Sequence, residues 1–226
     1  MIRLSGVSKS YGRRGQEVRA LGDVSLEVSE GEFVAIVGRS GSGKSTLLAI
    51  LGLVERPDAG SYQLDGADVA TLNDIELSKL RAKTFGFVFQ DFHLLSERTA
   101  AQNVVYPMQF GGVNVSERTP RAGQLLSSVS LGDRLHSRPS ELSGGEQQRV
   151  AVARSLANDP RVILADEPTG NLDTATRDSV MELLKDQWRA GRTLIVVTHD
   201  LQVAAQASRV IEMADGRVVT KELVAT

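Results

Sequence analysis

The sequence contains no cysteine and has no strong excess of charge of either sign. The missing cysteines exclude disulfides, thiol catalysis and cysteine-ligated metals, and they fit an intracellular chain. With 26 Lys and Arg residues against 28 Asp and Glu residues, the formal net charge is -2. A protein that binds a polyanion usually carries an excess of basic residues, so nucleic acid is not an expected partner.

Long apolar runs are also missing. Runs such as "FVAIV" and "LIVV" have the length of strands, far short of the roughly 20 residues that a membrane-spanning helix needs. The opening "MIRLSGVSKSYG" lacks the apolar core of a signal peptide, so no export is expected. If the protein works at a membrane, we expect another subunit to provide the spans.

The 226 residues are enough for one large domain with a sizeable core, and we expect a single domain over 1–226. Strand-like patterns open the chain, and after Pro160 strands alternate with helices, which favours an α/β fold with a mostly parallel sheet. Helical patterns dominate over 91–159, which predicts a helical subdomain inserted into a core formed by 1–90 and 160–226. Within it, "FGGVNVSERTP", residues 110–120, is predicted to be turn. The predicted helices are 44–54, 99–110, 121–131, 145–159 and 174–189.

The stretch "GRSGSGKS", Gly38 to Ser45, has the full spacing of a phosphate-binding loop between a strand and a helix. Its glycines allow backbone amides to turn toward phosphate oxygens, and the helix directs its positive end at them. Lys44 can reach the β- and γ-phosphates, and Ser45 can offer its hydroxyl to Mg²⁺. The predicted phosphate contacts are Gly38, Arg39, Ser40, Gly41, Ser42, Gly43, Lys44, Ser45 and Thr46.

An acidic pair follows a buried strand in "VILADEP", residues 162–168. Asp166 can hold Mg²⁺ or its water, and Glu167 can polarise the attacking water. Together with the phosphate loop, this pair predicts an enzyme that hydrolyses ATP or GTP. The sequence has no Asn-Lys-x-Asp stretch of the kind that reads guanine, so ATP is preferred. Tyr11 could stack on adenine, although a tyrosine near a strand end is more often half-buried packing.

A second phosphate-binding pattern lies in "ELSGGEQQRV", residues 141–150. Ser143 and Glu146 have the spacing of a helix capping box, which explains both residues without any ligand. The paired glycines Gly144 and Gly145 are not explained in this way, because glycine costs helix stability unless something approaches the backbone closely. A γ-phosphate is one such group.

Taken together, "LSGGEQQR", the phosphate loop, "VILADE" and a later histidine resemble the ATPase subunit of an ABC transporter over residues 2–219. The resemblance implies a P-loop NTPase core, an N-terminal antiparallel β subdomain and an α-helical subdomain. It also implies a head-to-tail homodimer with ATP and Mg²⁺, in which the signature loop of one copy closes over the ATP of the other. That loop is Ser143, Gly144, Gly145 and Glu146. A separate integral membrane permease is the implied partner, with the ATPase peripheral on the cytoplasmic face of the membrane.

The resemblance also assigns roles to single residues. Gln90 resembles the Q-loop glutamine that senses Mg²⁺ and the attacking water, and His199 resembles the switch histidine that contacts the γ-phosphate. Asp173 in "TGNLD" resembles the D-loop aspartate that crosses the dimer interface, and Tyr11 matches the adenine-stacking aromatic. The implied catalytic residues are Glu167, His199, Gln90 and Lys44, and the implied metal ligands are Ser45, Gln90 and Asp166. His93 and His136 match no catalytic position and are interpreted as surface or packing residues.

Finer features, "FVFQDFHLL", "ADEPTGNLD" and "IVVTHD", are similar to ATPases of the macrolide-exporter and lipoprotein-release type. This similarity predicts efflux or extraction of a hydrophobic cargo, which the ATPase sequence does not identify. A cell-division ATPase that transmits force without transport is the alternative, and a soluble ABC ATPase acting on nucleic acid is the rival class. Arg98 and Gln102 replace the Leu and Glu that are usual in relatives after the Q-loop, which puts the identity of the membrane partner in doubt.

Overall fold

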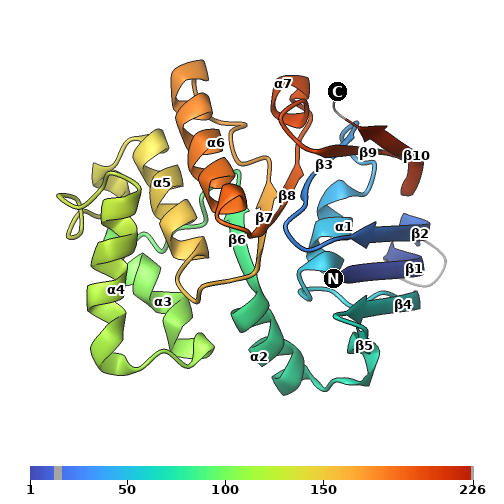
Figure 1. The fold of residues 1–226 in the computed structure, drawn as a ribbon, viewed down its shortest axis with the longest axis horizontal. Coiled ribbons are helices and arrows are strands. Elements are labelled where there is room, and N and C mark those ends of the chain that lie inside the picture. The colour runs from blue at the N-terminus through green and yellow to red at the C-terminus, as the bar shows by residue number, and fades with distance from the viewer. Residues whose placement is uncertain (13–16, 225–226) are drawn as a thin grey trace. The chain divides into compact units, whose positions relative to one another are not determined.

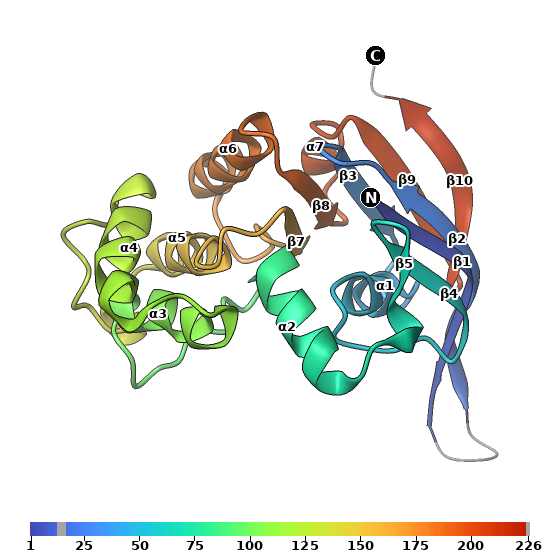
Figure 2. The same ribbon diagram turned by 60° about the horizontal axis from the view of Figure 1, so that its bottom comes forward.

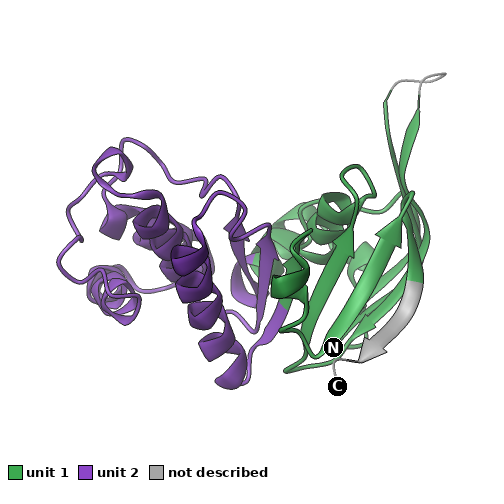
Figure 3. Cartoon of the chain, turned by 90° about the horizontal axis from the view of Figure 1, so that it is seen from above, with its two compact units in different colours: residues 1–81, 195–226 green, residues 82–194 purple. Residues whose placement is uncertain are grey.

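The computed structural model describes residues 1–12 and 17–224, and the chain divides into two compact units (Figure 3). Unit 1 comprises residues 1–81 and 195–226, and unit 2 comprises residues 82–194. The division falls inside two elements, the helix α2 (Asp74–Thr84) and the strand β8 (Thr193–Val197). Within the described residues, no helix is both long and apolar enough to cross a membrane.

Unit 1 contains an antiparallel sheet in the order β2-β1-β4-β5 (Figure 1). The central strand β1 pairs with β2 through Ile2↔Val28 and Leu4↔Leu26, and with β4 on its other side. Apolar residues alternate along β1, so that one face of the strand is buried. The strands are β1 (Ile2–Tyr11), β2 (Val18–Val28), β4 (Ala59–Leu64) and β5 (Ala67–Asp68). The N-terminal antiparallel subdomain implied by the resemblance is confirmed.

A second set of strands in unit 1 carries the phosphate loop. The buried strand β3 (Phe33–Gly38) runs parallel to β9 (Arg209–Ala214), which pairs with the antiparallel edge strand β10 (Arg217–Val224). On the other side of β3, the amide of Thr198 just after β8 donates to the carbonyl of Ile36 over 3.0 Å. The end of β3, where the phosphate loop begins at Gly38, therefore has a hydrogen-bonded chain segment on each side.

The helix α1 (Lys44–Leu51) follows the phosphate loop and packs on both β2 and β3 (Figure 2). Its last carbonyl, that of Leu51, accepts a 2.6 Å hydrogen bond from the hydroxyl of Tyr62 in β4. Tyr62 is fully buried, and burial raises the pKa of its hydroxyl far above the ordinary value. The helix end is therefore satisfied by a neutral donor from the antiparallel sheet.

Unit 2 combines a parallel strand pair with helices. Strand β6 (Phe85–Phe89) pairs with β7 (Val162–Asp166) from Phe85↔Val162 to Phe89↔Asp166, so both strands end at the same edge. The amide of Thr193 at the start of β8 donates to the carbonyl of Arg161 over 2.9 Å. Helices α3, α4 and α5 pack on one another, and α5 also contacts β6 and α6. The helices are α3 (Ala100–Gly111), α4 (Val115–Ser128), α5 (Gly144–Ser155) and α6 (Thr174–Arg189).

The turn predicted over 110–120 is wrong except at residues 112–114, which lie between α3 and α4. Residues 115–120 belong to α4, which begins at Val115 directly after Asn114 instead of at residue 121. Gly111, Gly112 and Pro120 suggested loop, but only Gly112 ends a helix, with a left-handed φ of 80° after α3. Pro120 lies inside α4 and removes one amide donor without ending the helix. The buried side chains of Ala122 and Leu126 stabilise this helix.

Several elements were not predicted: β5, α2, β9, β10 and the short helix α7 (Leu201–Ala204). The helix α2 begins with a reciprocal cap, in which the side chain of Asn73 accepts the amide of Glu76 over 3.0 Å and Glu76 accepts the amide of Asn73 over 2.9 Å. Its sequence is polar and Ile75 is exposed, so it shows no clear apolar stripe.

Candidate functional site

Gly38 and Gly43 of the phosphate loop are required by close contacts within unit 1. A β-carbon on Gly38 would collide with the carbonyl oxygen of Met213, and one on Gly43 would collide with that of Ala20. Gly41 and Gly43 also have left-handed φ values of 79° and 95°, which glycine adopts without steric cost. The chain therefore folds back tightly between β3 and α1, as a phosphate cradle must.

Two polar side chains of this loop are buried. Lys44 is 8% exposed, and its Nζ atom donates to the carbonyls of Gly38 and Arg39 over 2.9 and 3.0 Å. Ser42 is 5% exposed, and its hydroxyl is buried with no hydrogen-bond partner among the described residues. A buried ammonium, an unpartnered hydroxyl and the start of α1 thus lie on one loop, an arrangement that fits a bound phosphate chain.

The remaining loop residues face solvent. Arg39, Ser40, Gly41 and Ser45 are exposed, and Thr46 is half-buried at the start of α1. Ser45 is thus open to a ligand, as a metal-binding hydroxyl has to be.

Tyr11 lies at the end of β1 and is 42% exposed. The Nζ atom of Lys9 lies 5.6 Å from the centre of its ring, within cation-π range. Lys9 is itself held by ion pairs with Glu55 at 3.3 Å and Asp58 at 3.2 Å. One face of the tyrosine ring therefore carries a cation, and the exposed part of the ring remains open for stacking.

His199 follows β8 in unit 1 and is exposed. Its neighbours on both sides are fixed, because the amide of Asp200 donates to the hydroxyl of Thr198 over 3.0 Å and Asp200 caps α7 through the amide of Gln202. The backbone at His199 is therefore held at a defined turn.

In unit 2, Asp166 is the last residue of β7 and follows four fully buried residues. Glu167 comes next and has a φ of 45°. This left-handed conformation costs a non-glycine residue roughly 1–2 kcal/mol and is found preferentially at functional sites. The carbonyl of Glu167 accepts the amide of Gly170 over 3.1 Å, which closes the turn.

Gln90 follows β6, and its side-chain amide donates to Asn171 over 3.1 Å. Beneath it, the fully buried Gln148 of α5 donates its amide to the carbonyl of Phe89 over 3.2 Å and also to that of Pro168. Sequence reasoning missed Asn171 and Gln148. Asn171 lies in the quoted "TGNLD" and Gln148 in "LSGGEQQR", but nothing in the spacing of either motif indicates these contacts.

The signature loop forms the start of α5. Ser143 caps the helix by accepting the Glu146 amide over 3.3 Å, while Glu146 accepts the Ser143 amide over 2.8 Å. This hydrogen bond from the Ser143 backbone, with the Ser143 hydroxyl and the Arg134 guanidinium 3.4 Å away, lowers the pKa of Glu146. The capping box predicted as the ligand-free explanation of Ser143 and Glu146 is present. It does not involve the amides of Gly144 and Gly145.

The two glycines of this loop differ in their surroundings. A β-carbon on Gly145 would collide with the methyl group of Thr176 in α6, whereas one on Gly144 would meet only ordinary contacts with Phe92 and Leu172. Close packing against α6 therefore explains Gly145 without a phosphate, and the ligand argument is needed for Gly144 alone.

Asp173 is the N-cap of α6. Its carboxylate accepts the amide of Thr176 over 3.1 Å and the hydroxyl of Thr176 over 2.6 Å. The Thr176 hydroxyl, followed by the Thr176 amide, lowers the pKa of Asp173. Thr176 thus connects the D-loop, Gly170 to Asp173, with the glycine of the signature loop that it packs against.

The departures from the family pattern are partly explained. Gln102 forms a capping box with Thr99 at the start of α3. Its side-chain oxygen accepts the backbone amide of Thr99 over 3.0 Å, and its backbone amide donates to the Thr99 hydroxyl over 3.2 Å. Glutamine serves this role as well as glutamate. Nothing in the structure explains the side chain of Arg98. His93 and His136 are both exposed, and the His93 ring lies 4.7 Å from that of Phe89.

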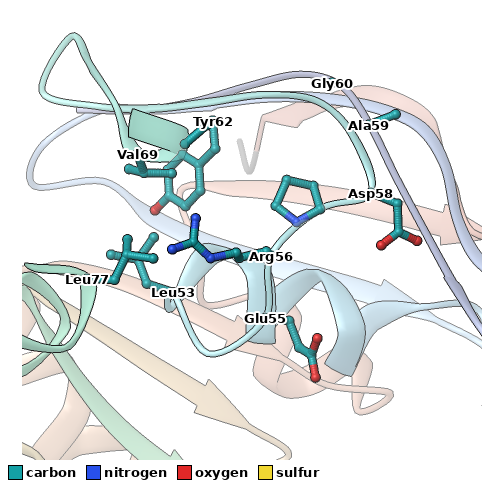
Figure 4. Close-up of a pocket in the computed structure, with 11 residues that line it drawn as sticks. Leu53, Glu55, Arg56, Asp58, Ala59, Gly60, Tyr62, Val69 and Leu77 are labelled. Atoms are coloured by element: carbon teal, nitrogen blue, oxygen red, sulfur yellow. The ribbon is translucent and has the colours of Figure 1, made fainter. Parts of the chain in front are cut away.

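A pocket of about 140 Å³ in unit 1 contains none of the predicted site residues (Figure 4). Tyr62, Val69 and Leu77 provide apolar walls. The guanidinium of Arg56, also in its lining, donates to the carbonyl of Leu72 over 2.9 Å and pairs with Asp74 at 3.0 Å. The pocket is separate from the phosphate loop.

Comparisons with known proteins identify the family. The family model described as ABC transporter matches residues 21–170. The chain is 53% identical over 97% of its length to "Macrolide export ATP-binding/permease protein MacB 1/2" of Paracoccus denitrificans, of which it covers 33%. It is 50% identical over 96% of its length to an "Uncharacterized ABC transporter ATP-binding protein" of Thermotoga maritima, of which it covers 93%. The chain thus spans about a third of the length of the macrolide-export relatives.

Comparison with solved structures supports the same family assignment. The chain is similar to "Dimeric structure of a post-hydrolysis state of the ATP-binding cassette MJ0796 bound to ADP and Pi", with a TM-score of 0.92, 42% identity and coverage of 100% of this chain and 99% of that one. The P-loop fold with a mixed sheet and helices is therefore confirmed. The chain belongs to the ABC transporter family, as one of its ATP-binding, ATP-hydrolysing cassettes.

Proposed function

We propose that two copies of this chain pair head to tail, so that the phosphate loop of one and the signature loop of the other enclose ATP. One observation carries the proposal: a single chain has a complete phosphate loop and, at the start of α5, a capped helix end whose Gly144 amide lies outside the capping box. A helix start of this kind favours an anion. The dimeric state of the similar cassette MJ0796 supports the pairing.

In this proposal the chain's own residues divide the reaction. Lys44 balances the charge of the γ-phosphate, and Glu167 accepts a proton from the attacking water as the new P–O bond forms and the bond to ADP breaks. His199 stabilises the charge that develops on the phosphoryl oxygens. Ser45, Gln90 and Asp166 would hold Mg²⁺, which neutralises phosphate charge when bound. ATP then acts as the link between the copies, and its hydrolysis loosens the pair.

We also propose that this cycle powers a separate integral membrane permease, with the cassette peripheral on the cytoplasmic face of the membrane. The identity to macrolide-export proteins, whose names join an ATP-binding part to a permease, supports a permease partner. The relative that is named only as an ATP-binding protein, of which the chain covers 93%, supports a permease on a separate chain. Efflux or extraction of a hydrophobic cargo is the activity that the similarity to the macrolide-export proteins favours.

The head-to-tail arrangement is tested by mixing two damaged chains in a Glu167→Gln background that retains ATP. One chain carries Lys44→Met and the other Ser143→Arg, with different affinity tags. Each mixed pair joins the intact phosphate loop of one chain to the intact signature loop of the other. We expect the mixed, doubly tagged pairs to retain one ATP each. Pairs of two Lys44→Met chains or of two Ser143→Arg chains should retain none, and pairs of two chains that carry only Glu167→Gln should retain two. Mixed pairs without ATP would contradict the arrangement.

The membrane partner is tested by copurification of tagged Glu167→Gln protein from native membranes with ATP and Mg²⁺, followed by mass spectrometry. We expect a polytopic protein with a large extracytoplasmic domain, and we expect Lys44→Met protein to recover less of it. A nucleic-acid-processing partner, or none despite intact ATP binding, would contradict the transporter proposal.

A further inference from the structure

The glutamine of the Q-loop, residues 90–93, is held by an asparagine of the D-loop. Gln90 Nε2 donates to Asn171 Oδ1 over 3.1 Å. In return, Asn171 Nδ2 donates to Asp91 Oδ1 over 3.2 Å and to the backbone carbonyl of Gln90 over 3.4 Å. All of these residues lie in unit 2. Three hydrogen bonds therefore tie the segment after β6 to the segment after β7.

The partners decide which way each amide group faces. A backbone carbonyl and a carboxylate only accept hydrogen bonds, so Asn171 has to turn its NH₂ group toward Asp91 and the Gln90 backbone. Its carbonyl oxygen then faces Gln90, and only the NH₂ group of Gln90 can donate to it. The Oε1 atom of Gln90 is consequently the end of the side chain left for other partners. Oxygen is the atom that binds Mg²⁺ or accepts a hydrogen bond from water.

The backbone around this pair is fitted to Gln90. A β-carbon on Gly170 would lie 3.0 Å from Nε2 and 3.1 Å from Cδ of Gln90, closer than ordinary contacts. The side-chain amide of Gln148 donates to the carbonyl of Phe89 at the end of β6 and to that of Pro168 after β7. Asn171 itself is exposed. Its side chain is therefore the part of this arrangement that can be changed without removing a buried group.

We propose that Asn171 is a positioning residue that fixes the amide orientation of Gln90, so that Oε1 and not Nε2 faces Mg²⁺ and the attacking water. The Asp91 carboxylate only accepts, so it fixes which end of the Asn171 amide faces Gln90 and thereby the orientation of the Gln90 amide. Because Asn171 lies two residues before Asp173, the same link makes the orientation of Gln90 depend on the D-loop. This inference rests on the proposed function, since it assumes that Gln90 acts on ATP with Mg²⁺.

The test measures ATP hydrolysis by the purified chain at saturating ATP while free Mg²⁺ is varied. For Asn171→Ala we expect the Mg²⁺ concentration at half-maximal rate to rise by about fivefold, the effect of one net hydrogen bond. ATP binding measured in EDTA should stay unchanged. Asn114→Ala is the matched control, because Asn114 is also exposed and its amide donates to a carboxylate, that of Glu117, over 3.1 Å.

A paired exchange separates orientation from simple support. Asn171→Asp places a carboxylate against Asp91, and the repulsion between the two carboxylates should move residue 171 away from Gln90 and raise the Mg²⁺ requirement as well. Adding Asp91→Asn restores a donor that faces position 171, while the carboxylate introduced there can still accept from Gln90, so the double variant should return toward wild-type Mg²⁺ dependence. In Gln90→Ala protein, Asn171→Ala should have no further effect.

Several outcomes would overturn the inference. One is an Asn171→Ala protein whose rate depends on Mg²⁺ as that of the wild type does. Another is an Asn171→Ala protein with a lower melting temperature and a lower rate but an unchanged Mg²⁺ dependence, because this result indicates only structural support. Failure of Asp91→Asn to rescue Asn171→Asp is a third. If the wild-type chain hydrolyses no ATP, the proposed function fails first, and the two failures are distinguished by that measurement.

Discussion

Arg154 of α5 donates one guanidinium N–H to the carbonyl oxygen of Phe92 over 2.8 Å and another to that of His93. Phe92 and His93 have φ values of 58° and 47°, and each such left-handed residue costs roughly 1–2 kcal/mol. Burial lowers the pKa of Arg154 to about 10, so the group keeps its charge at neutral pH. A single half-buried side chain thus holds the strained turn that follows Gln90.

Replacement of this arginine should destabilise the chain. In Arg154→Met two carbonyls lose their donor, which predicts a decrease in the free energy of unfolding of about 2–4 kcal/mol. Arg154→Lys should lose less, because an ammonium can still reach one carbonyl. Urea unfolding at neutral pH measures both. The control is Arg189→Met, an arginine in exposed ion pairs with Glu182 and Asp186, for which about 0–1 kcal/mol is expected. Equal losses for Arg154→Met and Arg189→Met would contradict the role of Arg154.

The charge on Glu146 should make stability depend on pH. The pKa of Glu146 in the folded chain lies below its ordinary value of 4.5, chiefly because its carboxylate accepts the Ser143 backbone amide. A depressed carboxyl pKa contributes stability that is fully present above the unfolded value and is lost as the pH falls through the folded value. Glu146→Gln keeps an acceptor but has no charge. Its unfolding free energy should therefore fall short of wild type at neutral pH, and the gap should close on acidification.

Urea titrations from about pH 7 down to about pH 3 check this prediction. Glu97→Gln, the same change at an exposed glutamate, serves as the control. A gap between Glu146→Gln and wild type that widened on acidification would reverse the expected sign.

Stacking on Tyr11 should contribute to ATP affinity. Removal of the ring in Tyr11→Ala should weaken ATP binding by roughly 5-fold to 150-fold, since base stacking on an aromatic ring is worth about 1–3 kcal/mol. Tyr11→Phe keeps the ring and should bind nearly as well. Calorimetric titration with ATP measures the dissociation constants, with Tyr106→Ala as the control because Tyr106 is an exposed tyrosine of α3. Equal affinity of Tyr11→Ala and wild type would exclude stacking.

Glu167 should be required for hydrolysis but not for binding. Glu167→Gln keeps the shape of the side chain and cannot accept the proton, so turnover should fall by roughly 100-fold or more. ATP affinity should remain, and the protein should accumulate as an ATP-bound dimer, detected by light scattering after size-exclusion chromatography. Unchanged turnover would remove Glu167 from the proposed role.

Much of the fold was predictable because local spacing carries it. The bounds of α6, Thr174–Arg189, agree with the prediction, since Asp173 provides a cap and apolar residues follow a helical period. The strand β7 was equally clear from its apolar run before Asp166. The start of α4 was missed because Pro120 and the glycines before it are loop signals, whereas burial of Ala122 and Leu126 kept the helix intact.

The sequence by itself determined the phosphate loop, because the spacing of its glycines, lysine and serine has a chemical meaning that needs no fold. Only the tertiary structure decided that Gly145 packs against Thr176 and that Gln90 pairs with Asn171. Gln90 and Asn171 are 81 residues apart, and no periodicity along the chain links positions so distant. They meet because the parallel strands β6 and β7 end side by side, which brings the loops that follow them within hydrogen-bonding reach.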